Sequence, residues 1–203
     1  MPGRLFLIVA ILTASFSVFW WATSTPVTAA TYGSGNYGDC VYGGELGNNA
    51  LSFAVNTSNV TMSPALSDTT TATGLATFDV ELGCSDLGYV VTIDGGAPSS
   101  GSHTLANLAT PTASLIDTEQ YGLNLVANTV PSIGVGPSGG IGQAASGYDT
   151  TDQFKYVSGD VIAEAITYSA QTTFTVSFIA NVTSTTPAGD YGTIHTLICT
   201  ATY

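Results

Sequence analysis

The strongest constraint on the fold is that apolar residues recur at every second position in three separate stretches. These positions are Phe78, Val80, Leu82 and Cys84 in the first stretch, Phe174, Val176, Phe178, Ala180 and Val182 in the second, and Leu197, Cys199, Ala201 and Tyr203 in the third. Successive side chains of a β-strand point to opposite faces, so this period predicts strands with one buried and one solvated face. Beyond residue 30, no stretch carries the 3.6-residue period of an amphipathic helix. The chain is therefore expected to be all-β.

Four further stretches are predicted to be strands, and turn sequences such as Asp94-Gly95-Gly96 separate them. They are residues 50–56, 89–93, 122–127 and 160–168. Many short strands joined by turns are typical of an antiparallel, immunoglobulin-like β-sandwich. Residues 31–203 have the length of one such domain.

Residues 129–152 differ from the rest of the chain because glycine is frequent there and two prolines interrupt them. A stretch of this length without strand periodicity predicts a long loop or insert within the sandwich. Such loops commonly carry function.

The first thirty residues have the three parts of an export signal. Residues 1–4 include Arg4, residues 5–22 are mostly apolar, and residues 23–30 are mostly small. This order predicts a signal peptide over 1–30, with an uncleaved anchor helix as the alternative. Membrane contact is expected only through residues 5–22, if they are retained. In both cases residues 31–203 would be secreted or displayed at the cell surface.

The three cysteines all follow this leader, in a compartment where disulfides form. Three cysteines allow three pairings. Cys84 and Cys199 both lie on the apolar side of their strands, which favours a bond between them across the two sheets. Closing a loop of more than one hundred residues would lower the entropy of the unfolded chain and so stabilise the fold by up to about 4–5 kcal/mol. Cys40 is then unpaired or forms an intermolecular bond.

The charge composition excludes one class of partner. The chain has two basic residues against fourteen acidic ones and a formal net charge of −12. Nucleic-acid binding relies on Lys and Arg to neutralise phosphates, so we expect no nucleic-acid partner. Electrostatic docking to anionic lipid is disfavoured for the same reason.

Catalytic motifs are weak in this sequence. His103 and His195 are the only histidines, and neither has metal-ligand spacing to the other or to a cysteine pair. Residues 134–140 match two glycine-rich motifs in form, but both motifs require a following helix, which we do not expect here. We predict no catalytic residue, no cofactor and no metal site, and hence that the protein is not an enzyme.

Two acidic pairs and one lysine leave smaller alternatives. The pairs Asp117 with Glu119, and Asp149 with Asp152, have oxygen ligands suited to Ca²⁺, although surface solvation is the more ordinary role. Calcium binding stays open at this stage. Lys155 either covers its aromatic neighbours with its aliphatic stem or forms an isopeptide cross-link with a nearby side chain.

Several stretches together resemble a known group of proteins. They are 85–95 (SDLGYVVTIDG), 118–129 (TEQYGLNLVANT), 152–163 (DQFKYVSGDVIA) and 174–203, together with the TYGSGNYGDCVYG run that starts at residue 31. These residues resemble uncharacterised exported surface proteins of epibiotic, reduced-genome bacteria of the candidate phyla radiation. The segment from TPAGDY to the C-terminus is similar to the last hairpin of bacterial immunoglobulin-like or pilin-like sandwiches. The resemblance implies an exterior location and a sandwich fold, but no site residues.

These observations favour a non-catalytic cell-surface protein, an adhesin or coat component that binds a surface protein or glycan through its loops. One alternative is a subunit that polymerises into a filament or layer, with the N-terminal Tyr/Gly segment adding to a neighbour's sheet and Cys40 locking it. A secreted glycan or cell-wall hydrolase, which needs two positioned carboxylates, is the third.

Overall fold

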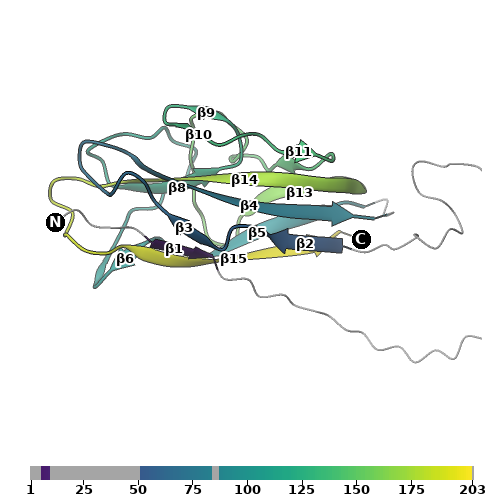
Figure 1. Ribbon diagram of the computed structural model, residues 1–203, viewed down its shortest axis with the longest axis horizontal. Coiled ribbons are helices and arrows are strands. Elements are labelled where there is room, and N and C mark those ends of the chain that lie inside the picture. The colour runs from purple at the N-terminus through teal and green to yellow at the C-terminus, as the bar shows by residue number, and fades with distance from the viewer. Residues whose placement is uncertain (1–5, 10–50, 84–86, 203) are drawn as a thin grey trace, which may run out of the picture.

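The computed structural model describes residues 6–9, 51–83 and 87–202, and within these ranges every regular element is a β-strand. The prediction of an all-β chain is confirmed for these residues. Two sheets face each other across a shared core, an arrangement consistent with a β-sandwich (Figure 1).

The larger sheet has the strand order β12-β13-β5-β15-β1-β3. Its strands are β12 (Gln143–Ala144), β13 (Val161–Ala165), β5 (Tyr89–Gly95), β15 (Gly192–Ala201), β1 (Phe6–Val9) and β3 (Asn59–Thr61), with β6 (Ser99–Ser100) and β7 (His103–Thr104) beside β15. Neighbouring strands in it are antiparallel, except that β1 runs parallel to β15.

The second sheet is built on a long antiparallel pair, β4 (Ala72–Leu82) and β14 (Ser169–Asn181), with Phe78 opposite Phe174. The remaining strands are β2 (Leu51–Val55) beside β4, and β8 (Gln120–Asn124) and β11 (Ser138–Gly139) beside β14. A separate hairpin, β9 (Asn128–Thr129) with β10 (Ser132–Ile133), lies outside this sheet (Figure 1).

The alternating apolar positions fill the space between the sheets, as their period predicts. The predicted inward residues of β4 and β14 that the structure describes are all buried, and on β15 Leu197 is buried while Cys199 and Ala201 are half-buried. Phe78 stacks on Phe174 with ring centroids 5.0 Å apart and meets Phe53 edge-on at 5.9 Å. This aromatic cluster joins β2, β4 and β14 within one core.

The outer face of β14 is buried as well, which alternation alone does not predict. Ser177, Ile179 and Asn181 point away from the core, yet each is at most 1% exposed. Asn181 donates from Nδ2 to the Ser114 hydroxyl and to Gln120 Oε1, each at 3.0 Å. The chain that follows β7 therefore folds back over this sheet as a third layer, visible above β14 in Figure 1.

The predicted leader lies outside the described residues except for Phe6–Val9, which form β1. No helix in the described ranges is long and apolar enough to cross a membrane. Cys40 and Cys84 also lie outside these ranges, and the Cys199 thiol is free. The Cys84–Cys199 bond stays a prediction.

Candidate functional site

The predicted loop 129–152 is ordered, and it contributes β11 to the second sheet and β12 to the larger sheet. One carboxylate fastens its two ends together: Asp152 accepts hydrogen bonds from the backbone N–H groups of Thr129 and Val130 at 2.7 and 2.9 Å. It also accepts the Thr129 hydroxyl at 2.5 Å. These hydrogen bonds hold the pKa of Asp152 below its usual value. Asp152 has a φ of 61°, so the backbone is held in a left-handed conformation to place this carboxylate.

A buried pair of amides continues this attachment towards the sheet. Asn124 at the end of β8 and Asn128 exchange side-chain hydrogen bonds of 2.6 and 2.8 Å. Asn128 Oδ1 also accepts the backbone N–H of Asp152 at 2.8 Å. The residues that close the loop are therefore connected to a strand of the second sheet.

The glycines of the loop permit close contact with the sheet below. A Cβ at Gly134, where φ is 81°, would lie 2.0 Å from the Ser177 hydroxyl on β14. Only glycine satisfies both the positive φ and this distance. Glycine at this position therefore lets the segment pack closely on β14.

This layer forms the rim of an open groove of about 450 Å³. Its lining includes Val126, Pro137, Gln143, Ser146, Asp149 and Glu164. Five of these lie in or beside the loop, and Glu164 comes from β13 of the larger sheet. Gln143 donates to Glu164 at 3.4 Å. The groove offers carboxylate, amide and hydroxyl groups beside a small apolar surface, which suits hydrogen bonding to a polar ligand.

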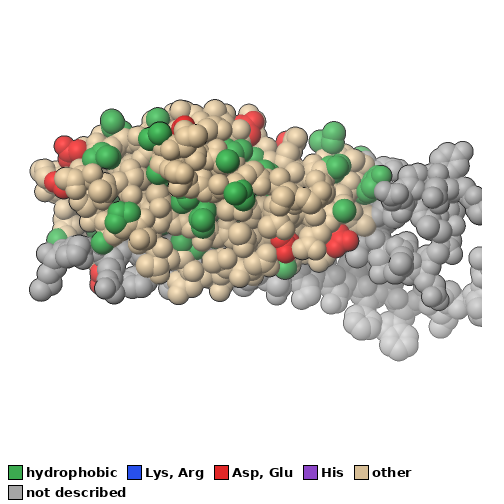
Figure 2. Space-filling model, turned by 45° about the horizontal axis from the view of Figure 1, so that its top comes forward, with side chains coloured by type: hydrophobic (Ala, Val, Ile, Leu, Met, Phe, Trp, Pro, Cys, Tyr) green, Lys and Arg blue, Asp and Glu red, His purple; other side chains and the backbone are tan. Residues whose placement is uncertain are grey.

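Apolar side chains stand exposed along the same loop. Val130, Val135 and Ile141 are 67%, 58% and 54% exposed. Figure 2 shows hydrophobic side chains spaced apart over a largely uncharged surface, with acidic groups near its margins. An uncharged surface with separate apolar side chains can contact a neutral partner, whereas it has no cations with which to bind a polyanion.

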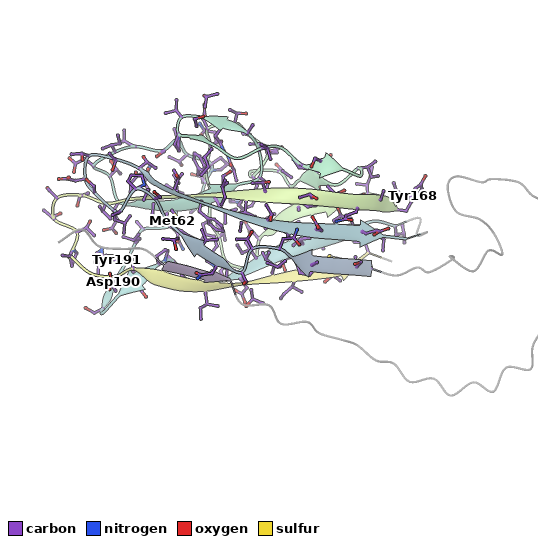
Figure 3. The ribbon with its side chains drawn as sticks, in the orientation of Figure 1. Met62, Tyr168, Asp190 and Tyr191 are labelled. Carbon is purple, nitrogen blue, oxygen red and sulfur yellow. The ribbon has the colours of Figure 1, made fainter. Side chains whose placement is uncertain are left out.

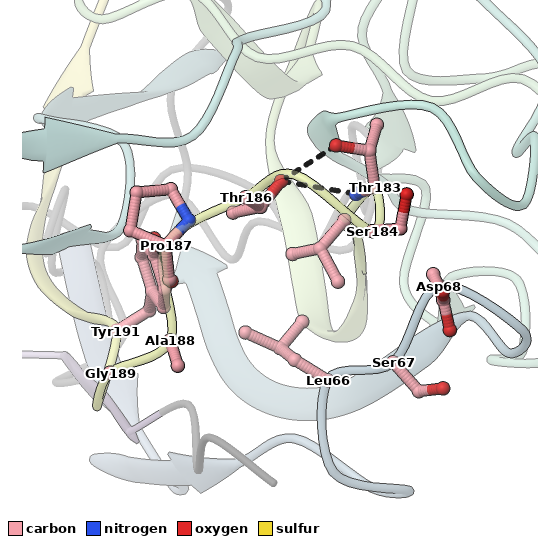
Figure 4. A pocket seen from close by; sticks show the side chains of 11 residues that line it. Leu66, Ser67, Asp68, Thr183, Ser184, Thr186, Pro187, Ala188, Gly189 and Tyr191 are labelled. Carbon is pink, nitrogen blue, oxygen red and sulfur yellow. Dashed lines mark hydrogen bonds between the residues drawn. The ribbon is translucent and has the colours of Figure 1, made fainter. Parts of the chain in front are cut away.

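A second hollow, of about 220 Å³, lies at the connection between β14 and β15. Ser67, Asp68 and Thr186 line it, and Thr186 accepts the backbone N–H of Thr183 at 3.0 Å (Figure 4). Tyr191 lies at this end of the sandwich, and Tyr168 lies at the other end (Figure 3). The hydroxyl of Thr186 is thus already used to shape its own turn.

The carboxylates of Asp149 and Asp152, one of the two acidic pairs considered for calcium, accept hydrogen bonds from different parts of the backbone. Asp149 Oδ1 accepts the backbone N–H of Gly147 at 3.1 Å, while the carboxylate of Asp152 faces Thr129 and Val130. No group of three or more His, Cys, Asp or Glu side chains in the described ranges is arranged to hold a metal ion.

Glu119 forms three hydrogen bonds within the protein. Its Oε2 lies 2.8 Å from His103 Nε2 and accepts the Thr186 hydroxyl at 3.0 Å, and its Oε1 accepts the Ala106 N–H at 3.1 Å. In a nucleophilic triad the histidine must lie between the hydroxyl and the carboxylate. Here the carboxylate lies between the other two, so His103 does not activate Thr186.

His195 is sealed inside the core, where it cannot reach a substrate. The Tyr156 hydroxyl donates to the Gly95 carbonyl at 2.6 Å and lies 3.0 Å from His195 Nδ1. Nδ1 must then carry the proton, and Nε2 accepts the Tyr121 hydroxyl at 2.7 Å. Burial lowers the pKa of His195 to about 4, which keeps the ring neutral.

Lys155 forms an ion pair beside an aromatic ring. Its Nζ lies 2.5 Å from Asp160 Oδ2 and 5.1 Å from the centre of the Tyr148 ring, and Tyr148 donates its hydroxyl to the same carboxylate oxygen at 3.0 Å. The aliphatic stem lies beside Gly147.

Comparison with known proteins finds no matching family model, no matching curated protein and no matching solved structure. The loop 129–152 was predicted from the sequence, but its partners Val126 and Glu164 in the groove were not. Glu164 lies in a strand whose alternation is weak, and no local pattern connects it to a loop twenty residues earlier.

Proposed function

We propose that this chain is a non-catalytic protein of the cell exterior, an adhesin or coat component that binds a cell-surface protein or glycan. Its immunoglobulin-like character and its likeness to exported surface proteins of epibiotic bacteria belong to the same proposal. Two facing antiparallel sheets support the fold, and the predicted leader 1–30 supports the location.

The observation that carries the proposal is the fastened loop layer with its 450 Å³ groove. Because Asp152 and the amide pair hold the loop in place, a ligand pays little of the entropy that ordering a free loop would cost. The net charge of −12 favours a ligand that is neutral or basic.

The groove can be blocked without disturbing the core. Ser146 is exposed and lines the groove, so Ser146→Tyr adds bulk where a ligand would sit. Ser102→Tyr places the same side chain in the exposed turn between β6 and β7 and is the matched control. We expect Ser146→Tyr to weaken binding to host cells and to a glycan array about tenfold or more, and Ser102→Tyr to leave it unchanged.

Two results would overturn the proposal. One is a parent chain that binds cells and glycans no better than an unrelated protein of equal charge. The other is a Ser146→Tyr chain, with an unchanged thermal midpoint, that binds as well as the parent. Deleting 129–152 is a poorer test, because it also removes β11 and β12 from the two sheets.

A further inference from the structure

The hollow of about 220 Å³ lies apart from the groove, between the β3–β4 connection and the β14–β15 connection (Figure 4). Leu66, Ser67 and Asp68 line one side of it, and residues between Val182 and Tyr191 line the other. The hollow and the groove have no lining residue in common. A ligand in the hollow would therefore occupy a separate site.

The buried part of the lining is apolar. Leu66, Val182 and Tyr191 are 8%, 8% and 2% exposed. The Tyr191 hydroxyl is already paired, because it donates to the Pro187 carbonyl at 2.8 Å. These three side chains thus offer apolar surface to whatever enters the hollow.

The polar part of the lining has two groups that the protein does not use. Asp68 is half-buried, and within the described ranges its carboxylate takes part in no hydrogen bond or ion pair. The exposed hydroxyl of Ser184, across the hollow, is likewise unpaired among these residues. The hydroxyls of Thr183 and Thr186, by contrast, lie 3.2 Å apart and bond to each other. A carboxylate and a hydroxyl are therefore left for a ligand.

The charges around the hollow favour a cation. Lys155, the one lysine or arginine among the described residues, is paired with Asp160. A second carboxylate, that of Glu119, lies next to the lining and accepts the Thr186 hydroxyl at 3.0 Å. Acidic side chains stand at this end of the molecule on the face that Figure 2 shows. Negative charge without a matching cation attracts a basic ligand and repels an anion.

We propose that the hollow binds the side chain of a lysine from a partner protein. A lysine has an apolar four-carbon stem and a charged head that stays near water. Its stem would contact Leu66 and Val182, and its ammonium would donate to Asp68 and Ser184. The volume lies below the roughly 300–1,000 Å³ of sites for drug-sized ligands, so it suits a single side chain.

The arrangement of the acceptors favours lysine over arginine. The ammonium has three donors that can turn towards acceptors on different sides, whereas the planar guanidinium is suited to two parallel bonds to one carboxylate. Asp68 and Ser184 lie on opposite sides of the hollow. This inference goes beyond the proposed function, since it concerns a different site and specifies the chemistry of the ligand.

The experiment titrates two peptides into the isotope-labelled chain and follows backbone amide signals by NMR. One peptide is acetyl-Gly-Lys-Gly-amide, and the other carries Nε-acetyllysine, which keeps the stem and removes the charge. Physiological ionic strength screens general attraction to the net charge of −12. We expect the lysine peptide to shift signals within 66–68 and 182–191, and the acetyllysine peptide to bind about tenfold more weakly or less.

Two matched variants locate the contact, because each removes one negative charge. Asp68→Asn is expected to weaken binding of the lysine peptide about tenfold or more. Glu81→Gln is expected to leave binding unchanged. Glu81 is exposed near the far end of β4, whose first residue, Ala72, lies opposite Ala180 beside the hollow (Figure 1).

The proposal is wrong if the lysine peptide shifts no signal of the hollow at any concentration up to its solubility. It is equally wrong if the two peptides bind alike, or if Asp68→Asn and Glu81→Gln weaken binding to the same extent, since general charge attraction would then account for it. None of these results bears on binding in the groove, so the two proposals fail separately.

Discussion

At the scale of single residues, the most consequential side chain is His195, which the core keeps neutral. Tyr121 donates to one ring nitrogen and Tyr156 receives from the other, so a proton added at Nε2 would require the Tyr121 hydroxyl to accept where it now donates. Tyr121, Tyr156 and His195 are each fully buried. Their role is to satisfy polar groups between the sheets, and this role has a consequence for stability in acid.

We predict that His195 makes the domain less stable as the pH falls from 7 to 5. Burial lowers the folded-state pKa from 6.5 to about 4, with Asp94 opposing this only in part. The unfolded chain therefore binds the proton first, and the free energy of unfolding should decrease by about 2 kcal/mol over this interval. Urea unfolding at the two pH values measures the change.

His195→Gln is the control for this pH dependence. It removes the titrating group, so the decrease between pH 7 and pH 5 should largely disappear even if the variant is less stable throughout. An equal decrease in the parent and in His195→Gln would contradict the assignment.

At the scale of elements, the loop 129–152 depends on one carboxylate for its attachment. We predict that Asp152→Ala frees the loop while the sandwich stays folded, because the three hydrogen bonds to Thr129 and Val130 are lost. Limited proteolysis should cut within 129–152 about tenfold faster than in the parent.

Asp149→Ala is the matched control on the same loop. Asp149 hydrogen-bonds only to nearby residues, Gly147 and Thr150, so its loss should change the cleavage rate little. Equal cleavage of the two variants, or global unfolding of Asp152→Ala, would show that Asp152 does not act as a local fastening.

The elements also show how far the sequence predicts this fold. The stretches 50–56 and 160–168 contain β2 and β13, and the stretch 89–93 covers β5 except for its last two residues. Each stretch has one polar and one apolar face or is a short apolar run between turns. The stretch 122–127 overlaps β8 but starts two residues late. β8 is buried on both faces under the third layer, and such burial leaves no alternation to mark where the strand begins.

The short strands of the loop layer were not predictable for a different reason. β11 and β12 are two residues each and are defined by partners on β14 and β13, which lie much later in the chain. A glycine-rich sequence is also typical of mobile loops, so the composition does not reveal that these glycines allow close packing. The groove is therefore a product of tertiary contacts, whereas the core positions follow from the local period.

At the scale of the whole molecule, the two sheets are held together by apolar burial with little help from charge. Lys155 is the one lysine or arginine in the described part of the chain. Its partner in the ion pair, Asp160, is only five residues away in the sequence. Among the described residues, therefore, no ion pair of a lysine or arginine joins one sheet to the other. A covalent bond between the sheets would add to this apolar burial.

The remaining prediction is that Cys84–Cys199 is this bond. Cys199 points inward from β15, and burial raises the pKa of its thiol to about 12, so the buried thiol is a poor nucleophile. The bond should therefore form while the strands assemble. Leu82, two residues before Cys84, is buried at the end of β4 in the facing sheet.

Peptide mapping of the oxidised, exported chain should recover residues 84 and 199 in one linked pair. Reduction should lower the free energy of unfolding by up to about 4–5 kcal/mol, because the unfolded chain regains the entropy of a loop longer than one hundred residues. Cys40→Ser should leave both results unchanged, and Cys199→Ser should abolish them. A linked peptide that contains Cys40 in place of Cys84 would contradict this prediction.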